Sequence, residues 1–108
     1  MTFHSLSIQL YPKDLTGERL ASAAASSKRL LDLDHIARRC GPYALADWAH
    51  AVGLEVQHVD NCWCRVPVTE AMLISFARDV LNDADVATEA IGQAGGSDGR
   101  FVIEAEEF

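Results

Sequence analysis

The sequence predicts an α+β domain in which helices cover one face of an antiparallel sheet. Three observations favour this class. Short segments alternate apolar and polar residues, as half-buried strands do, and longer segments between them carry apolar residues at helical spacing. These segments follow one another as strand, helices, hairpin, helix and strand. With 108 residues, 49% of them hydrophobic, the chain is expected to form a single globular domain over residues 1–108.

The first strand and the first helix follow from local pattern. Leu6, Ile8 and Leu10 alternate with polar residues, which is the period of a half-buried strand. Pro12 ends this strand, because proline cannot donate to a ladder. The alanine-rich stretch that follows predicts a helix over residues 16–32.

Two further helices are expected before the hairpin. Asp34 is a candidate cap for a short helix over residues 34–40, which the next glycine and proline must close. Residues 43–52 carry an apolar stripe at helical spacing, and Gly53 suits the position just past the end of that helix.

A β-hairpin follows, because residues 54–58 and 64–68 both alternate. A three-residue loop over residues 60–62 pairs His58 with Cys64 and keeps one face apolar, whereas a two-residue loop mixes core and solvent faces. The three-residue loop is therefore preferred. Its third residue would be a cysteine at a position that usually needs positive φ.

The last helices and strand complete the order. The broadest apolar stripe predicts a helix from Thr69 to about Asn82, and Asp83 or Asp85 can cap a further helical segment. Residues 100–108 alternate again and predict the final strand.

This order is the βαββαβ pattern of a ferredoxin-like split fold, a four-stranded antiparallel sheet with helices packed on one face. Right-handed crossovers would place the last strand beside the first, with the second strand on the other edge. The last strand is then an exposed edge, and Glu104 and Glu106 on it would block stray strand pairing. On such a solvated edge nothing apolar is expected to raise either pKa.

Charge is concentrated in the second half of the chain. Residues 1–65 hold equal numbers of acidic and basic residues, whereas residues 66–108 hold nine acids against two bases, which accounts for the net charge of −7. An acidic half repels nucleic acid and anionic membranes and attracts basic partners. A solvated surface that keeps the protein soluble would have the same composition.

The cysteines and the N-terminus bear on the compartment. Three cysteines are too few, and odd in number, for a disulfide framework, and the first residues lack the features of a signal peptide. No apolar run reaches the length of a transmembrane helix. We therefore expect a cytoplasmic protein.

The stretch HVDNCWC, residues 58–64, is the densest group of metal-ligand residue types. His58, Cys62 and Cys64 are weak candidates for a metal site, because their spacing matches none of the common zinc patterns. Buried thiols that behave as small apolar side chains are the preferred interpretation. Trp63 would lie on the opposite strand face, either as an apolar anchor for a partner or covered by another part of the chain.

The profile is that of a small acidic protein without a catalytic constellation. It predicts a protein-binding inhibitor, such as a bacterial immunity protein or antitoxin that neutralises a basic toxin, for example a nuclease, by charge-complementary occlusion. We expect no cofactor, no catalytic residue and no nucleic-acid or membrane partner, and a monomer or homodimer. The predicted partner-binding residues are Trp63, Asp79, Asp83, Asp85, Glu89, Asp98, Glu104, Glu106 and Glu107.

The alternative is a small ferredoxin-like enzyme or ligand-binding domain, expected to be a dimer that forms its pocket between sheet and helices. His4, His58 and Trp63 would line that pocket. A buried histidine with a shifted pKa would favour this alternative, and a flat acidic surface would favour the inhibitor.

Overall fold

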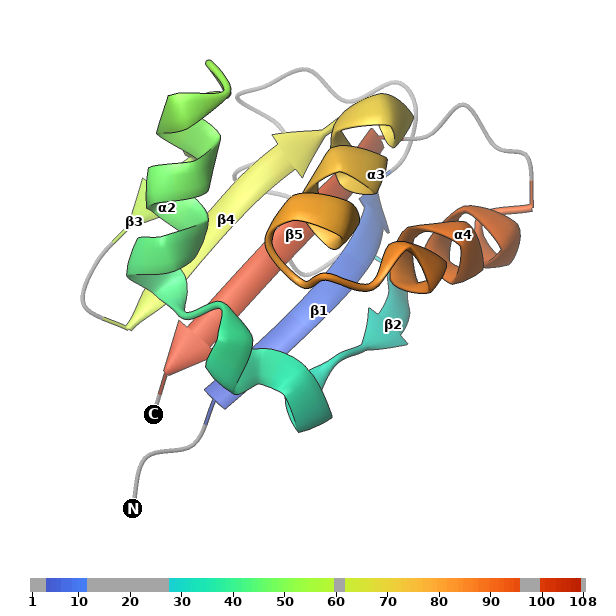
Figure 1. Cartoon of the computed structure of the whole chain (residues 1–108), viewed down its shortest axis with the longest axis horizontal. Coiled ribbons are helices and arrows are strands. Elements are labelled where there is room, and N and C mark those ends of the chain that lie inside the picture. The colour runs from blue at the N-terminus through green and yellow to red at the C-terminus, as the bar shows by residue number, and fades with distance from the viewer. Residues whose placement is uncertain (1–3, 12–27, 60–61, 96–99, 108) are drawn as a thin grey trace.

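A single antiparallel sheet organises the part of the chain that the structure describes. The computed structural model describes residues 4–11, 28–59, 62–95 and 100–107. The described strands form a five-stranded sheet in the order β2-β1-β5-β4-β3, with α2, α3 and α4 on one side of it (Figure 1). In chain order the elements are β1 (His4–Tyr11), β2 (Lys28–Asp32), the 3-10 helix η2 (Asp34–Arg39), α2 (Pro42–Ala51), β3 (His58–Val59), β4 (Trp63–Val68), α3 (Glu70–Asp79), α4 (Ala84–Gln93) and β5 (Arg100–Glu107).

The predicted α+β class, with an antiparallel sheet and helices on one face, is confirmed. The predicted strands over the first, third and fourth segments are present as β1, β4 and β5, whereas the strand predicted over residues 54–58 is reduced to the two-residue β3 and shares only His58 with it. The strand order differs from the predicted one at the centre of the sheet, because β5 pairs along its length with β1 on one side and with β4 on the other. The last strand does lie beside the first and β3 does lie at an edge, as expected. The prediction that the last strand is an exposed edge is wrong.

The fifth strand, β2, replaces the end of a predicted helix. Residues 16–27 of that helix lie outside the described residues, and residues 28–32 form a strand antiparallel to β1. Leu30 and Leu31 pack against the core, and the Leu33 N–H donates to the Leu6 carbonyl at 2.7 Å. Pairing with β1 therefore overrides the helical preference of the local sequence.

The helices begin and end close to where the sequence predicts. Thr69 caps α3 by accepting a hydrogen bond from the Met72 N–H at 3.3 Å, and Asp83 caps α4 through the Asp85 N–H at 3.2 Å. Gly53, with φ of 78°, follows α2. Asp34 does not cap η2, which has no side-chain cap, because one of its carboxylate oxygens accepts the Leu6 N–H of β1 at 3.1 Å. Every helix among the described residues is too short or too polar to cross a bilayer.

The β3–β4 pairing is shifted by one residue from the prediction. His58 lies opposite Arg65, and Cys64 lies opposite Val59. Cys62, the third residue of the predicted loop, does not have the positive φ that such a loop usually requires, since Asn82 is the one non-glycine residue with positive φ in the described ranges. Pro67 cannot donate to a ladder, which agrees with a β3 that begins only at His58, opposite Arg65, and does not extend back to the position opposite Pro67.

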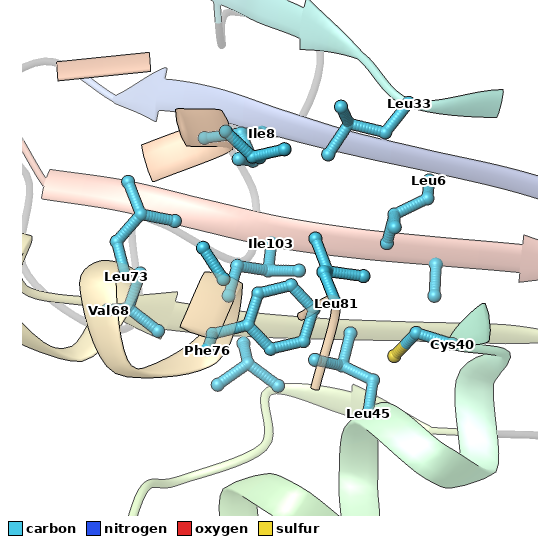
Figure 2. Packing of buried hydrophobic residues seen from close by; sticks show 14 of the residues in the cluster. Leu6, Ile8, Leu33, Cys40, Leu45, Val68, Leu73, Phe76, Leu81 and Ile103 are labelled. Carbon is cyan, nitrogen blue, oxygen red and sulfur yellow. The ribbon is translucent and has the colours of Figure 1, made fainter. Parts of the chain in front are cut away.

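The core lies between the sheet and the helices. Cys64 and Val66 of β4 face it in register with Ala105 and Ile103 of β5, as the alternation of these strands predicts. Figure 2 shows Phe76 of α3 among side chains from β1, β5 and α2. Its ring is fully buried, and its centroid lies 5.0 Å from that of Trp48.

Replacing Phe76 tests this packing. Phe76→Ala is expected to lower the free energy of unfolding by about 3–5 kcal/mol, because it removes a large buried side chain and leaves a cavity. The matched control is Ile74→Ala on the same helix, whose side chain is 40% exposed and should change stability far less. Urea unfolding of both variants measures the difference. Equal losses would contradict the described packing.

Candidate functional site

The sheet face turned away from the described helices carries a buried polar cluster. Ser7 and Gln9 of β1, Arg65 of β4 and Glu104 of β5 alternate with core residues on their strands and therefore point to this face. Register places Glu104 opposite both Ser7 and Arg65. We call these four residues the Arg65 cluster.

An ion pair lies at the centre of the Arg65 cluster. The Arg65 Nε lies 3.2 Å from Glu104 Oε2, and the side chains are 2% and 12% exposed. The Gln9 amide donates to Glu104 Oε1 at 3.1 Å and to Ser7 Oγ at 3.0 Å. The Glu104 carboxylate therefore has a cation beside Oε2 and an amide donor on Oε1, which offsets part of the cost of burying two charges.

Trp63 and Glu106 extend this face toward the end of the sheet. The Arg65 guanidinium carbon lies 5.7 Å from the centroid of the half-buried Trp63 ring, within the range of a cation–π contact. Burial lowers the pKa of Arg65, and the Glu104 carboxylate opposes that shift.

Glu106 departs from the sequence-based expectation. Burial raises the pKa of the Glu106 carboxyl above its usual value of 4.5, and the charge of Glu104 and a hydrogen bond to it act in the same direction. The expected solvated edge, with nothing to raise either pKa, is thus wrong for Glu106. The reason is the strand order, since a central β5 places both glutamates between neighbouring strands.

The predicted partner-binding residues divide between two faces. Trp63, Glu104 and Glu106 lie on the sheet face described above, Glu107 lies at the end of β5, and Asp98 lies outside the described residues. The remaining four are exposed at the end of α3, in the turn after it and on α4. We call these four the acidic surface; they are Asp79, Asp83, Asp85 and Glu89.

Two members of the acidic surface already have local partners. Asp79 accepts hydrogen bonds from Arg78 at 3.0 Å and Ser75 at 3.2 Å, and the Arg78 bond is the main reason that the pKa of Asp79 is lowered. Asp83 caps α4. Asp85 and Glu89 lie four residues apart on α4, which contains no lysine or arginine.

The metal-ligand candidates are not brought together. The shifted register places His58 opposite Arg65 rather than Cys64, and Cys62 is exposed whereas Cys64 is buried. Within the described ranges, no group of three or more His, Cys, Asp or Glu residues could hold a metal ion. The expectation of buried thiols in residues 58–64 is confirmed for Cys64 and is wrong for Cys62; Cys40, outside that stretch, is buried as well.

Burial also sets the reactivity of the thiols. It raises the pKa of Cys40 to about 12, with a smaller contribution from Cys64, and raises the pKa of Cys64 to about 11. At neutral pH both side chains are therefore uncharged thiols, which are poor nucleophiles.

The sequence reasoning missed the Arg65 cluster. One signal was present: Arg65 stands between the apolar Cys64 and Val66 in an alternating strand, so a charged side chain had to occupy the face away from the core. Its partner could not be identified without the pairing of β4 with β5.

Breaking the ion pair should destabilise the protein strongly. Arg65→Met leaves the Glu104 charge buried without its cation, and we expect a loss of about 3–5 kcal/mol in the free energy of unfolding. Adding Glu104→Met should restore much of that loss, because no buried charge then remains. Arg29→Met, which removes one partner of a 3.7 Å ion pair between exposed side chains, is the control and should cost less than about 1 kcal/mol. A double variant no more stable than Arg65→Met would contradict the coupling.

The thiols give a second test. A thiol-specific disulfide reagent at neutral pH should modify exposed Cys62 quickly and leave Cys40 and Cys64 unmodified until the protein unfolds. Cys62→Ser should abolish the fast reaction, which absorbance of the released chromophore would follow. Fast labelling of that variant would show that a buried thiol is accessible.

Known proteins supply no assignment for this arrangement. Comparison of the chain with protein-family models, with curated proteins and with solved structures found no match. The function therefore has to be argued from the two faces themselves.

Proposed function

We propose that the protein binds a basic protein through its acidic surface and inhibits it. In this proposal it acts as an immunity protein or antitoxin of bacterial type, and its target is a basic toxin such as a nuclease. Its place of action would be the cytoplasm, where such a toxin meets its substrates. The observation that carries the proposal is the exposed, nearly uncompensated negative charge of α3, α4 and the turn between them.

The charge balance of this region supports the proposal. Residues 69–95 contain five acids, and Arg78 is the one basic residue among them. Arg39 approaches from η2, where its guanidinium donates to the Leu81 carbonyl at 3.2 Å. Arg39 and Arg78 thus have partners of their own, the Leu81 carbonyl and Asp79. Asp85 and Glu89 are the members of the acidic surface most available to a partner.

The spacing of these two residues adds a physical reason. Like charges four residues apart on a helix destabilise it by roughly 0.2–0.5 kcal/mol. A lysine or arginine of a partner placed between Asp85 and Glu89 would convert that repulsion into attraction. Arginine would gain most, because its planar guanidinium can donate two parallel hydrogen bonds to one carboxylate.

Inhibition would follow from steering and occlusion. A surface of one charge sign accelerates encounter with a partner of the opposite sign, and the effect weakens as salt screens it. Once bound, the helices would cover the cationic groups with which the target holds its own anionic substrate. Trp63, Glu104 and Glu106 play no part in this surface, because they lie on the other face of the sheet.

The test combines capture with charge reversal. The tagged protein is incubated with lysate of its native host at low salt and eluted with a salt gradient, and a basic protein should be released as salt rises. Asp85→Lys/Glu89→Lys should then weaken the affinity for that protein by at least about tenfold and flatten its salt dependence.

The control changes net charge equally at another place. Asp47→Lys/Glu55→Lys alters two exposed acids outside the acidic surface and should leave the affinity within a few-fold of the wild type. Equal weakening by both double variants would show that net charge, not this surface, governs binding. Unchanged affinity in the α4 variant would refute the proposed interface.

A ligand-binding or enzymatic role is the second candidate. The raised pKa of Glu106 beside the buried Arg65 cluster favours it, since perturbed carboxyl groups gather at functional sites. Of the residues expected to line a pocket, His4 and Trp63 are half-buried, and the side chain of His58 lies outside the described ones. A thermal-shift screen against small molecules separates the two roles: a ligand whose stabilisation is lost in Glu106→Gln but kept in the α4 variant would support the second.

A further inference from the structure

The strongest unexplained feature is that exposed charges of opposite sign lie close together without pairing. Arg38 and Arg39 are exposed at the end of η2, and Asp85 and Glu89 are exposed on α4. The Arg39 guanidinium donates to the carbonyl of Leu81, just before the turn that leads into α4, at 3.2 Å. The end of η2 therefore lies beside the acidic surface.

These charges have no ionic partner in the described part of the chain. Among the described residues, neither arginine forms an ion pair, and the two α4 carboxylates form none either. Arg39 uses its guanidinium on a neutral carbonyl, and a guanidinium has several N–H donors, so donors remain for a carboxylate. A partner that presented the same two groups in reverse would pair all of them.

A second copy of this chain is such a partner. In a two-fold dimer the same patch meets itself, so a residue that contacts another across the axis is contacted by it in return. An axis between η2 and α4 would set the arginines of each protomer against the α4 carboxylates of the other. Arginine favours this pairing, because its planar guanidinium can donate two parallel hydrogen bonds to one carboxylate.

We propose that η2 and α4 form a two-fold interface in which Arg38 and Arg39 of one protomer pair with Asp85 and Glu89 of the other. The consequence for regulation rests on the proposed function: the dimer would cover the acidic surface until a basic target displaces the second copy. Dimerisation itself does not depend on that function.

Net charge sets the strength of this interface. Two copies with a net charge of −7 each repel at long range. At physiological salt the Debye length is about 8 Å, so repulsion between distant charges is largely screened, whereas pairs in contact are screened less. Exposed ion pairs are individually weak. We therefore expect a dimer that forms at roughly 100 µM rather than at nanomolar concentrations and that dissociates as salt approaches about 1 M.

Sedimentation of the full chain, without any other protein, tests the proposal. At physiological salt the wild type should change from monomer to dimer between about 10 µM and 1 mM. Asp85→Lys/Glu89→Lys should weaken self-association by at least about tenfold, and so should Arg38→Glu/Arg39→Glu. Both reversals place like charges across the axis.

Mixing the two reversed variants makes the measurement specific. A heterodimer of the two restores opposite charges at both contacts, so an equimolar mixture should associate at least about tenfold more strongly than either variant alone. Arg38→Glu alone keeps the bond from Arg39 to Leu81 and should lose part of the self-association. This variant guards against an effect of the double reversal on folding, which thermal unfolding would detect.

The matched control places the same change of charge elsewhere. Asp47→Lys/Glu55→Lys alters two exposed acids outside the acidic surface and should still dimerise. A wild type that stays monomeric up to about 1 mM, a dimer that survives both reversals, or a mixture no more associated than its components would overturn the interface.

Failure of this inference can be distinguished from failure of the proposed function. A dimer with the expected charge dependence supports the interface even if no basic target is captured. A captured target bound to a monomeric wild type supports the proposed function and overturns the interface. If both hold, the target complex should contain one copy of the chain, and a complex that retains the dimer would contradict the displacement.

Discussion

The position of β5 between β1 and β4 is the constraint on which both faces of the sheet depend. Because it is paired on both sides, its alternating residues are divided between two crowded environments rather than between a core and open solvent. Phe101, Ile103 and Ala105 enter the core under the helices. Glu104 must then lie next to whatever its neighbours present on the other face, and β4 presents Arg65. The buried ion pair is a consequence of the strand order.

The acidic residues of this chain therefore have different structural roles, although in the sequence they add up to a single excess of negative charge. Glu104 is enclosed and has a cation and an amide as partners, so its contribution is to the stability of the sheet. Asp83 stabilises the start of α4 through the backbone. Asp85 and Glu89 face solvent on a helix without basic residues, so their field extends outward. Only the last kind suits the recognition of a partner.

Much of the fold could be predicted because its signals are local. Period-two alternation identified the core faces of β1, β4 and β5, and the caps at Thr69 and Asp83 follow from residue type and spacing. The strand order and the β3–β4 register could not be obtained in this way, because they depend on contacts between segments far apart in the chain. Residues 28–32 show the same limit, since their pairing with β1 decides their conformation. The Arg65 cluster was missed for this reason. The exposed acids of α4 could be found because the polar face of an amphipathic helix follows from local sequence spacing alone.

The central place of β5 also affects how the molecule assembles. Its partners β1 and β4 precede it in the chain, and β1 is separated from it by almost ninety residues of sequence, taking the Tyr11–Arg100 pair as the nearest. During synthesis, the backbone groups of β1 and β4 that pair with β5 stay unpaired until residues 100–107 leave the ribosome. Loop closure over such a distance is entropically costly, and sheets of this kind fold slowly. In that interval the exposed edges can pair with other chains, so aggregation during synthesis competes with completion of the sheet.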